Sequence, residues 1–378
     1  MDLFKLLVKE DRLHPLFKRI VSSKEYEPTI DVINRWSTGL VGRKKECRKF
    51  IQDFQLSFNS SLWELYLNKA FTDFGLSVDY SMESPDFSLH HSSGRVVNVE
   101  AVTSNNKDNL KPEYYLKESL SSASALSNDD FLDESTIKLA GKLKDKRDLF
   151  IGINKKKHPY HSLEHVKGNP FVIAVAPFDN HLSFFQNNMA INRVLYGINP
   201  PPPMGNGKKI IHILNRNAQK IELGIFTNPS YKEVSAVIFS TTGMFGKAVV
   251  QAGLSNFVRA TRYRQMVVDE FMKIEGPDRL GTSHKTIKPG HDIFSMRFLN
   301  GNFVFGSDTY LYPSSEHKES HLDGLHIYYN PYASVPLDRD IFSEYEVTQN
   351  DFDVNTQEMV CNHNDGALVS RQTFTSLA

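Results

Sequence analysis

Three carboxylates within residues 58–106 stand at positions that could form a catalytic site. Glu64 lies in an amphipathic segment, Asp86 directly follows a proline, and Glu100 lies in an apolar run. Two acidic groups held close together repel each other, which a bound cation relieves. Carboxylates with room for water suit Mg²⁺ or Mn²⁺, and these ions support phosphodiester hydrolysis by activating water and neutralising developing charge.

The elements around these carboxylates can be read from hydrophobic periodicity. Residues 61–74 place their apolar side chains on one helical stripe, and Gly75 follows where a helix end commonly needs a left-handed residue. The pattern then predicts strands at residues 77–80, 87–90 and 95–102, with a glycine-containing turn between the last two. Asp86 and Glu100 therefore lie on the two arms of a hairpin, and antiparallel pairing predicts that they lie close together.

At these positions the chain resembles the PD-(D/E)XK, or restriction-endonuclease-like, nuclease superfamily. That pattern has a Glu on the first core helix, a Pro-Asp that opens a strand and an acid on the next strand, matched here by Glu64, Pro85-Asp86 and Glu100. Residues 54–106 are also similar to a poorly characterised bacterial family within the superfamily. The resemblance implies that Asp86 and Glu100 hold Mg²⁺ or Mn²⁺, with Glu64 completing the site directly or through water.

The superfamily pattern has a lysine two residues after the second acid, where this chain has Val102. A lysine from another element could reach the same point. The predicted helix at residues 135–149 offers Lys142 and Lys146, which are four residues apart and share a face. By resemblance, Lys146 is the first choice for the catalytic lysine and Lys142 the second. A solvated helix face is the alternative for either lysine.

The resemblance implies an α/β fold, with a restriction-endonuclease-like core of mixed sheet flanked by helices, N-terminal helices and a C-terminal α+β extension. The corresponding regions are 1–55, 56–198 and 208–378, and the last could pack as one domain with the core. A run of four prolines at residues 200–203 favours a connection at that boundary.

The rest of the chain gives further secondary-structure predictions. A polar loop with a short helix around 113–120 is expected at 104–133, and the β-branched run at 171–176 predicts a fully buried strand. Helices are predicted at 182–194 and 258–274, strands at 221–226, 234–240, 303–305 and 325–328, and a frayed tail at 362–378.

Composition describes an ordinary soluble protein. Lys plus Arg and Asp plus Glu number 44 each, so the net charge is zero, which weighs mildly against nucleic-acid binding without excluding a local basic groove. Two distant cysteines make neither a disulfide framework nor a zinc site, which fits a reducing cytoplasm. No run is long and apolar enough to span a bilayer, so no membrane association is expected.

Histidines give weaker signals. His158, His161 and His165 lack acidic or thiol partners at clear ligand spacing, which favours surface histidines. His317 and His321 lie in a loop-like stretch that favours packing or substrate contacts over a second metal site.

The sequence therefore predicts a Mg²⁺-dependent nuclease of the cytoplasm. The resemblance implies DNA as the favoured substrate, a role in defence against foreign DNA would fit such a family, and a homodimer or a partner protein stays open. The alternative, which Val102 keeps open, is a catalytically inactive nuclease-fold module that binds DNA or a protein partner.

Overall fold

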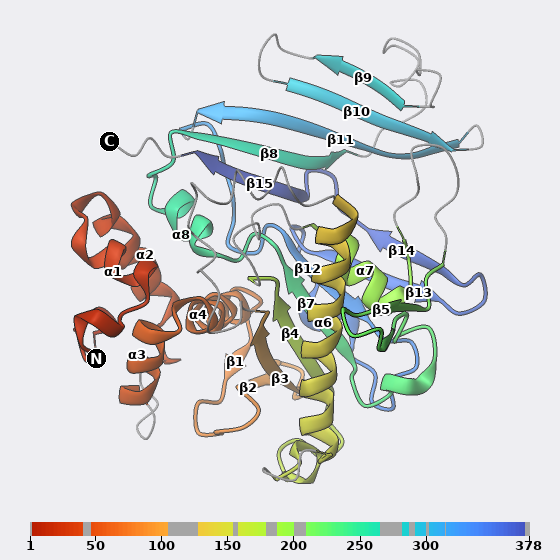
Figure 1. The fold of residues 1–378 in the computed structure, drawn as a ribbon, viewed down its shortest axis with the longest axis horizontal. Helices are drawn as coiled ribbons and strands as arrows, with labels where there is room; N and C mark the ends of the chain where they lie inside the picture. The colour runs from red at the N-terminus through yellow and green to blue at the C-terminus, as the bar shows by residue number, and fades with distance from the viewer. Residues whose placement is uncertain are drawn as a thin grey trace.

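A computed structural model shows how these segments are arranged (Figure 1). It describes residues 2–40, 47–104, 128–153, 158–178, 187–199, 209–264, 282–286, 292–299, 302–313 and 315–374. The short helix predicted around 113–120 and the proline run at 200–203 lie outside these ranges.

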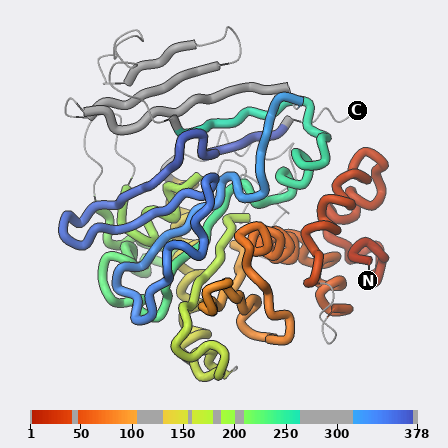
Figure 2. The backbone as a smooth tube through the Cα atoms, turned by 180° about the vertical axis from the view of Figure 1, so that it is seen from behind, coloured from red at the N-terminus to blue at the C-terminus, as the bar shows by residue number. Residues whose placement is uncertain are grey.

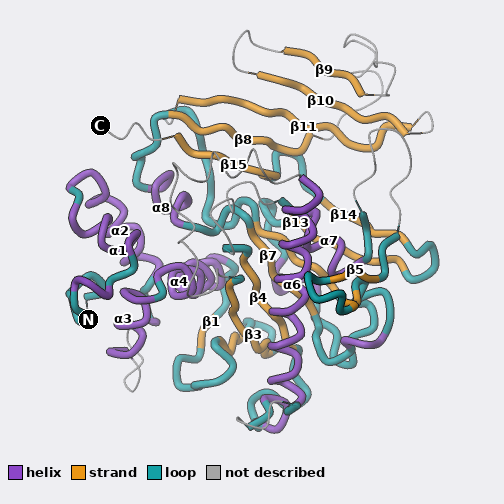
Figure 3. Tube along the Cα trace, viewed as in Figure 1, coloured by secondary structure: helices purple, strands orange, loops and turns teal. Residues whose placement is uncertain are grey.

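The first part of the chain is helical, as predicted. Its helices are α1 (Pro15–Ser22), α2 (Glu27–Trp36), α3 (Cys47–Leu56) and α4 (Phe58–Asp73). Figure 3 shows them grouped beside the sheet. The helix predicted at 61–74 is α4, which begins three residues earlier because Phe58 and Leu62 extend its buried stripe. Gly75 follows it with φ of 72°, a left-handed conformation that glycine adopts without steric cost.

An eight-stranded mixed sheet forms the centre of the molecule, in the order β1-β2-β3-β4-β7-β12-β13-β14. β3, β4 and β7 are parallel, as are β12 and β13, and the other neighbours are antiparallel. The strands are β1 (Ser77–Val78), β2 (Phe87–His90), β3 (Val96–Thr103), β4 (Phe171–Ala176), β7 (Ala236–Ser240), β12 (Leu325–Tyr329), β13 (Thr348–Asp353) and β14 (Glu358–Asn362). The α/β class is therefore confirmed.

Helices cover both faces of this sheet. Alternate residues of β4 enter different cores: Val172 and Ala174 pack with α4 on one face, and Ile173 and Val175 pack on the other. The second face is covered by α6 (Asn128–Ile151) and α7 (Met189–Tyr196). In Figure 1, α6 runs across the front of the strands. Burial on both faces explains the continuous apolar run that predicted β4.

The remaining elements include a second sheet. It has five strands, in the order β15-β8-β11-β10-β9. They are β8 (Phe257–Arg264), β9 (Thr282–Thr286), β10 (Asp292–Leu299), β11 (Asn302–Pro313) and β15 (Leu368–Phe374). The other elements are α8 (Phe245–Gln251), the strand pair β5 (His212–Leu214) and β6 (Lys220–Glu222), and the 3-10 segments η1 (Glu10–Arg12), η2 (Lys24–Tyr26), η4 (Tyr160–Ser162), η6 (Pro229–Tyr231) and η7 (Arg339–Phe342).

Several predicted elements are wrong. The start of the predicted helix 258–274 is strand β8, and β15 lies in the predicted frayed tail. Residues 128–133 of the predicted loop begin α6, and β6 covers only the start of the strand predicted at 221–226. β8 and β15 pair with each other across more than a hundred residues, so contacts between distant parts of the chain override local composition there.

The predicted C-terminal region shares the central sheet with the predicted core. Its strands β7 and β12 to β14 extend the sheet beyond β4. The view from behind shows these late segments on the far side of β4 from the hairpin of β2 and β3 (Figure 2). Among the described residues, no helix has the combination of length and apolar character that crossing a membrane requires.

Candidate active site

The hairpin of β2 and β3 brings Asp86 and Glu100 close together. Phe87 is paired with Val99, so the next positions along the ladder are Asp86 and Glu100. Phe87 and Val99 face the core on the α4 side, and the alternation of side chains along β3 directs Glu100 to the α6 side, where Lys146 contacts it. The backbone N–H of Asp86 donates to Glu100 Oε2 at 3.3 Å, and the N–H of Ala101 donates to Asp86 Oδ2 at 2.8 Å.

Lys146 reaches this pair from α6. Its Nζ lies 2.7 Å from Glu100 Oε1, with 23% of the lysine side chain and 4% of the glutamate side chain exposed. Lys146 and Val102 line the same cavity. The ammonium group of Lys146, which comes from α6, therefore reaches the cavity that the side chain of Val102 lines.

Lys142 lies one turn before Lys146 and does not contact the carboxylates. It lines the same cavity as Lys146, and it makes no hydrogen bond or ion pair within the described part of the chain. The structure thus separates the two lysines that the sequence left as alternatives: Lys146 joins the acidic pair and Lys142 stands apart from it.

Glu64 lies between two cavities next to the carboxylate pair. The lysine cavity has a volume of about 290 Å³ and is lined by Ser60, Trp63, Glu64, Ala101, Val102, Thr103, Lys142 and Lys146. The acidic cavity has a volume of about 170 Å³ and is lined by Leu40, Cys47, Lys49, Phe50, Asp53, Ser61, Glu64, Glu83 and Asp86. Glu64 also acts on Lys146 electrostatically, so it belongs to the same neighbourhood as Asp86 and Glu100.

The charges of the site act strongly on one another. Burial and the nearby charge of Asp86 raise the pKa of Glu100 to about 7, although Lys146 opposes the shift. Burial lowers the pKa of Lys146, but Glu100, Asp86 and Glu64 outweigh burial and raise it. The lysine therefore stays charged at neutral pH, and Glu100 can gain or lose its proton near pH 7.

Tyr160 and His165 support the site, and the sequence interpretation missed this. The hydroxyl of Tyr160 donates to Glu100 Oε1 at 3.4 Å. His165 Nε2 lies 2.8 Å from the carbonyl oxygen of Ser84, immediately before the Pro-Asp turn. His165 is half-buried and contacts a backbone carbonyl oxygen, whereas His158 and His161 are exposed as predicted. No local pattern signals these contacts, because each joins two residues that are far apart in sequence, by 60 positions for Tyr160 and Glu100 and by 81 positions for His165 and Ser84.

The donor set fits a hard divalent cation held largely through water. Within the described residues, no three or more His, Cys, Asp or Glu side chains are placed to hold a metal ion. Two carboxylates do converge at Asp86 and Glu100, and their repulsion is visible in the raised pKa of Glu100. Mg²⁺ commonly takes one or two carboxylates and keeps several waters, so this pair suits Mg²⁺ or Mn²⁺.

His321 belongs to the core. It is buried, its Nε2 donates to the carbonyl oxygen of Tyr66 at 2.9 Å, and its ring packs at 5.0 Å from that of Trp36. His317 Nε2 lies 2.8 Å from Glu319 Oε2, inside a buried ion cluster. Both histidines therefore pack inside the protein.

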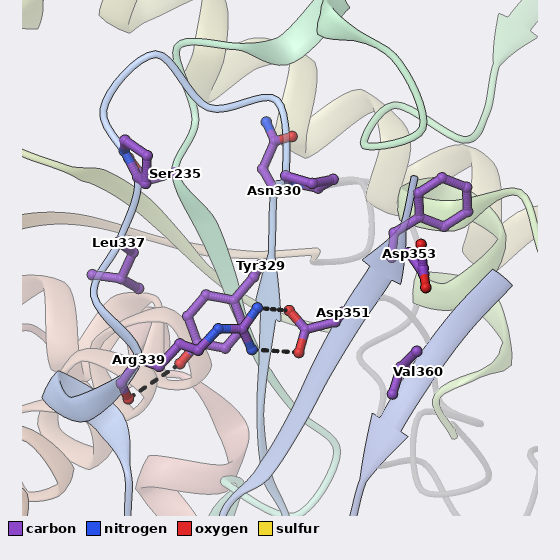
Figure 4. A pocket seen from close by; sticks show the side chains of 11 residues that line it. Ser235, Tyr329, Asn330, Leu337, Arg339, Asp351, Asp353 and Val360 are labelled. Carbon is purple, nitrogen blue, oxygen red and sulfur yellow. Dashed lines mark hydrogen bonds and ion pairs between the residues drawn. The ribbon is translucent and has the colours of Figure 1, made fainter. Parts of the chain in front are cut away.

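A separate cavity of about 530 Å³ lies near the β12–β14 edge of the central sheet (Figure 4). Arg339 and Asp351 face each other across it in a two-pronged ion pair. The Arg339 guanidinium also lies 4.7 Å from the centre of the Tyr329 ring. The arginine and the aspartate are thus engaged with partners of this chain, and the carboxylate pair with Lys146 remains the stronger candidate site.

No family model, curated protein or solved structure matches this chain.

Proposed function

We propose that this protein is a divalent-metal-dependent nuclease with a restriction-endonuclease-like core, and that DNA is its substrate. The observation that carries the proposal is the convergence of Asp86, Glu100 and Lys146 at one hairpin: two carboxylates for a cation and an ammonium group for a phosphate. The order of α4, β1, the β2–β3 hairpin, α6 and β4 supports the assignment of the core, since it follows the element order that the superfamily resemblance implies.

Each residue has a distinct role in this proposal. Asp86 and Glu100 hold Mg²⁺ or Mn²⁺, and Glu64 contributes through water from the border of the two cavities. When bound, the ion supplies charge neutralisation and a water of lowered pKa. Lys146 orients the attacking water or stabilises the negative charge that develops on the phosphate. Tyr160 and the N–H of Asp86 hold the Glu100 carboxylate in place.

The test is to neutralise Asp86 while keeping its shape. Asp86→Asn should lower Mg²⁺- or Mn²⁺-dependent DNA cleavage by roughly 100-fold or more, the range typical of losing one transition-state contact. Asp340→Asn removes the same charge at an exposed position and should leave cleavage unchanged. Cleavage by purified Asp86→Asn at the wild-type rate, or cleavage by the wild type that survives EDTA, would overturn the proposal.

Val102 favours an inactive nuclease-fold module as the second candidate, because the usual lysine position is apolar. Calorimetry with Mn²⁺ separates the two. The nuclease should take up Mn²⁺ and lose it in Glu100→Gln, whereas the inactive module should give no heat of binding.

A further inference from the structure

The lysine cavity has the chemistry of an anion site. Two of the side chains that line it are lysines, against one carboxylate, Glu64. The ammonium group of Lys146 is bound by Glu100, whereas Lys142 is half-buried and has no partner within the described residues. A cation that lines a cavity without a counter-charge attracts a negatively charged group.

Two hydroxyl groups also line the lysine cavity. Ser60 Oγ and Thr103 Oγ1 lie 2.7 Å apart where α4 meets the end of β3, and both residues line the lysine cavity. Hydroxyls of this kind, together with lysine, are common ligands of phosphate oxygens. Val102 and Ala101 leave room between them and the lysines, because neither side chain is long. The volume of about 290 Å³ admits a small group such as a phosphodiester with part of its sugar.

The acidic cavity has the opposite polarity. Asp53, Glu64, Glu83 and Asp86 line it, with Lys49 as the only lysine or arginine among its lining residues. Among the described lining residues, the acidic cavity has four carboxylates against one lysine and the lysine cavity has two lysines against one carboxylate, so the lysine cavity is the one whose charge suits a phosphate. Glu64 lines both, which places the border between them beside the carboxylate pair.

We propose that the lysine cavity binds the phosphate adjacent to the scissile phosphate of a DNA strand, with Lys142 as its ionic contact. This inference rests on the proposed nuclease function and assigns the second lysine to substrate binding. Lys146 then serves the reacting phosphate, and Lys142, four residues or about 6 Å away along the helix axis, serves its neighbour. The DNA backbone runs from the carboxylate pair toward the lysine cavity and away from the acidic cavity.

The experiment measures DNA binding without cleavage. A fluorescent 20-base-pair duplex is titrated with protein in EDTA at several NaCl concentrations. Lys142→Met should weaken binding roughly tenfold, since a hydrogen bond to a charged group is lost. It should also reduce the slope of log K against log [NaCl] by about 0.9, the value for one phosphate contact. Lys142→Arg keeps the charge and should restore the wild-type slope.

The matched control is Lys144→Met. Lys144 lies on the same helix and carries the same charge, but it forms an ion pair with Asp148 and does not line the lysine cavity. Its loss should leave the slope at the wild-type value. An unchanged slope in Lys142→Met, or equal losses in Lys142→Met and Lys144→Met, would overturn the inference.

Two further readouts separate the possible sources of phosphate and the two proposals. Inorganic phosphate is titrated against the wild type by calorimetry. Saturable phosphate binding that depends on Lys142, together with an unchanged DNA slope in Lys142→Met, would identify a small-anion site and overturn the DNA assignment. If the Lys142 dependence of DNA binding holds while no metal ion supports cleavage, the nuclease proposal fails and the phosphate contact stands.

Discussion

The Nζ atom of Lys146 lies 2.7 Å from Glu100 Oε1, although 46 residues separate the two in sequence. Lys146 comes from α6 and Glu100 from β3, so the contact exists only when the helix is packed on the sheet. Val102 lines the same cavity as Lys146. A lysine introduced at position 102 could therefore present its ammonium group in the same space.

Because Lys146 and Val102 line the same cavity, we predict that a lysine at position 102 can take over the role of Lys146. On the proposed mechanism, Lys146→Met should lower metal-dependent DNA cleavage by roughly 100-fold or more, because the phosphate loses the ammonium group that stabilises its developing charge. Adding Val102→Lys in that background should restore part of the rate, since the new side chain enters the same cavity. The measurement is single-turnover cleavage of a labelled duplex.

Val102→Lys in the wild-type background is the control for this exchange. It adds a second ammonium group beside Lys146 and should not raise the rate. A double variant no faster than Lys146→Met, with both variants folded by circular dichroism, would show that the lysine acts from a geometry that position 102 does not reach.

The proton of Glu100 should make the stability of the metal-free protein depend on pH. The pKa of this carboxyl rises from 4.5 to about 7 on folding, because burial and Asp86 disfavour its charge. A group with a raised folded pKa contributes stability that is present below its unfolded pKa and is lost as the pH rises through its folded pKa. Between about pH 4.5 and pH 7 the contribution falls, by about 3 kcal/mol at most, at 1.36 kcal/mol per unit.

Urea unfolding in EDTA at pH 5 and pH 8 measures this difference. The wild type should lose more stability than Glu100→Gln over this interval, because glutamine has no proton to lose. The free energy of unfolding should recover in the wild type at pH 8 when Mn²⁺ replaces EDTA in the buffer, since a ligand of the native state stabilises it. Identical pH profiles for wild type and Glu100→Gln would mean that Glu100 is already ionised at pH 5.

The parts of the site that lie near one another in sequence could be predicted, and the distant parts could not. One turn joins the strands of Asp86 and Glu100, so strand alternation alone set their pairing. Lys142 and Lys146 share a helix face, and only the packing of α6 on β3 shows which of them reaches Glu100. Tyr160 carries no local signal, because its contact depends on how the segment after α6 returns to the sheet.

The misread segments have a common physical cause. In β8, Val258 and Ala260 are buried and Arg259 is exposed, a period of two that the longer run up to residue 274 obscured. In β15, Leu368 is buried and Arg371 is held by Glu319, so a polar composition conceals a packed strand. Charged residues that are buried through pairing do not look like core residues in a sequence.

A buried ion cluster connects β15 to the central part of the molecule. Glu319 Oε1 lies 2.6 Å from Lys247 Nζ, and Glu319 Oε2 lies 2.9 Å from Arg371 Nε. The side chains of Lys247 and Glu319 are fully buried. Although burial raises the pKa of Glu319, Arg371 and Lys247 outweigh burial and hold it far below its usual 4.5, so the carboxylate is ionised at neutral pH.

Removing the carboxylate should destabilise the protein strongly. Glu319→Gln leaves two buried cations without their counter-charge, and breaking a buried ion pair from one side costs about 3–5 kcal/mol. Glu358→Gln, at an exposed position on β14, should change the free energy of unfolding by less than about 0.5 kcal/mol. Urea unfolding at pH 7 gives both values, and the double variant Lys247→Met with Glu319→Gln should recover part of the loss, because one buried cation is removed. Equal stability of Glu319→Gln and the wild type would mean that water reaches the two cations and that β15 is attached to the rest of the protein by other contacts.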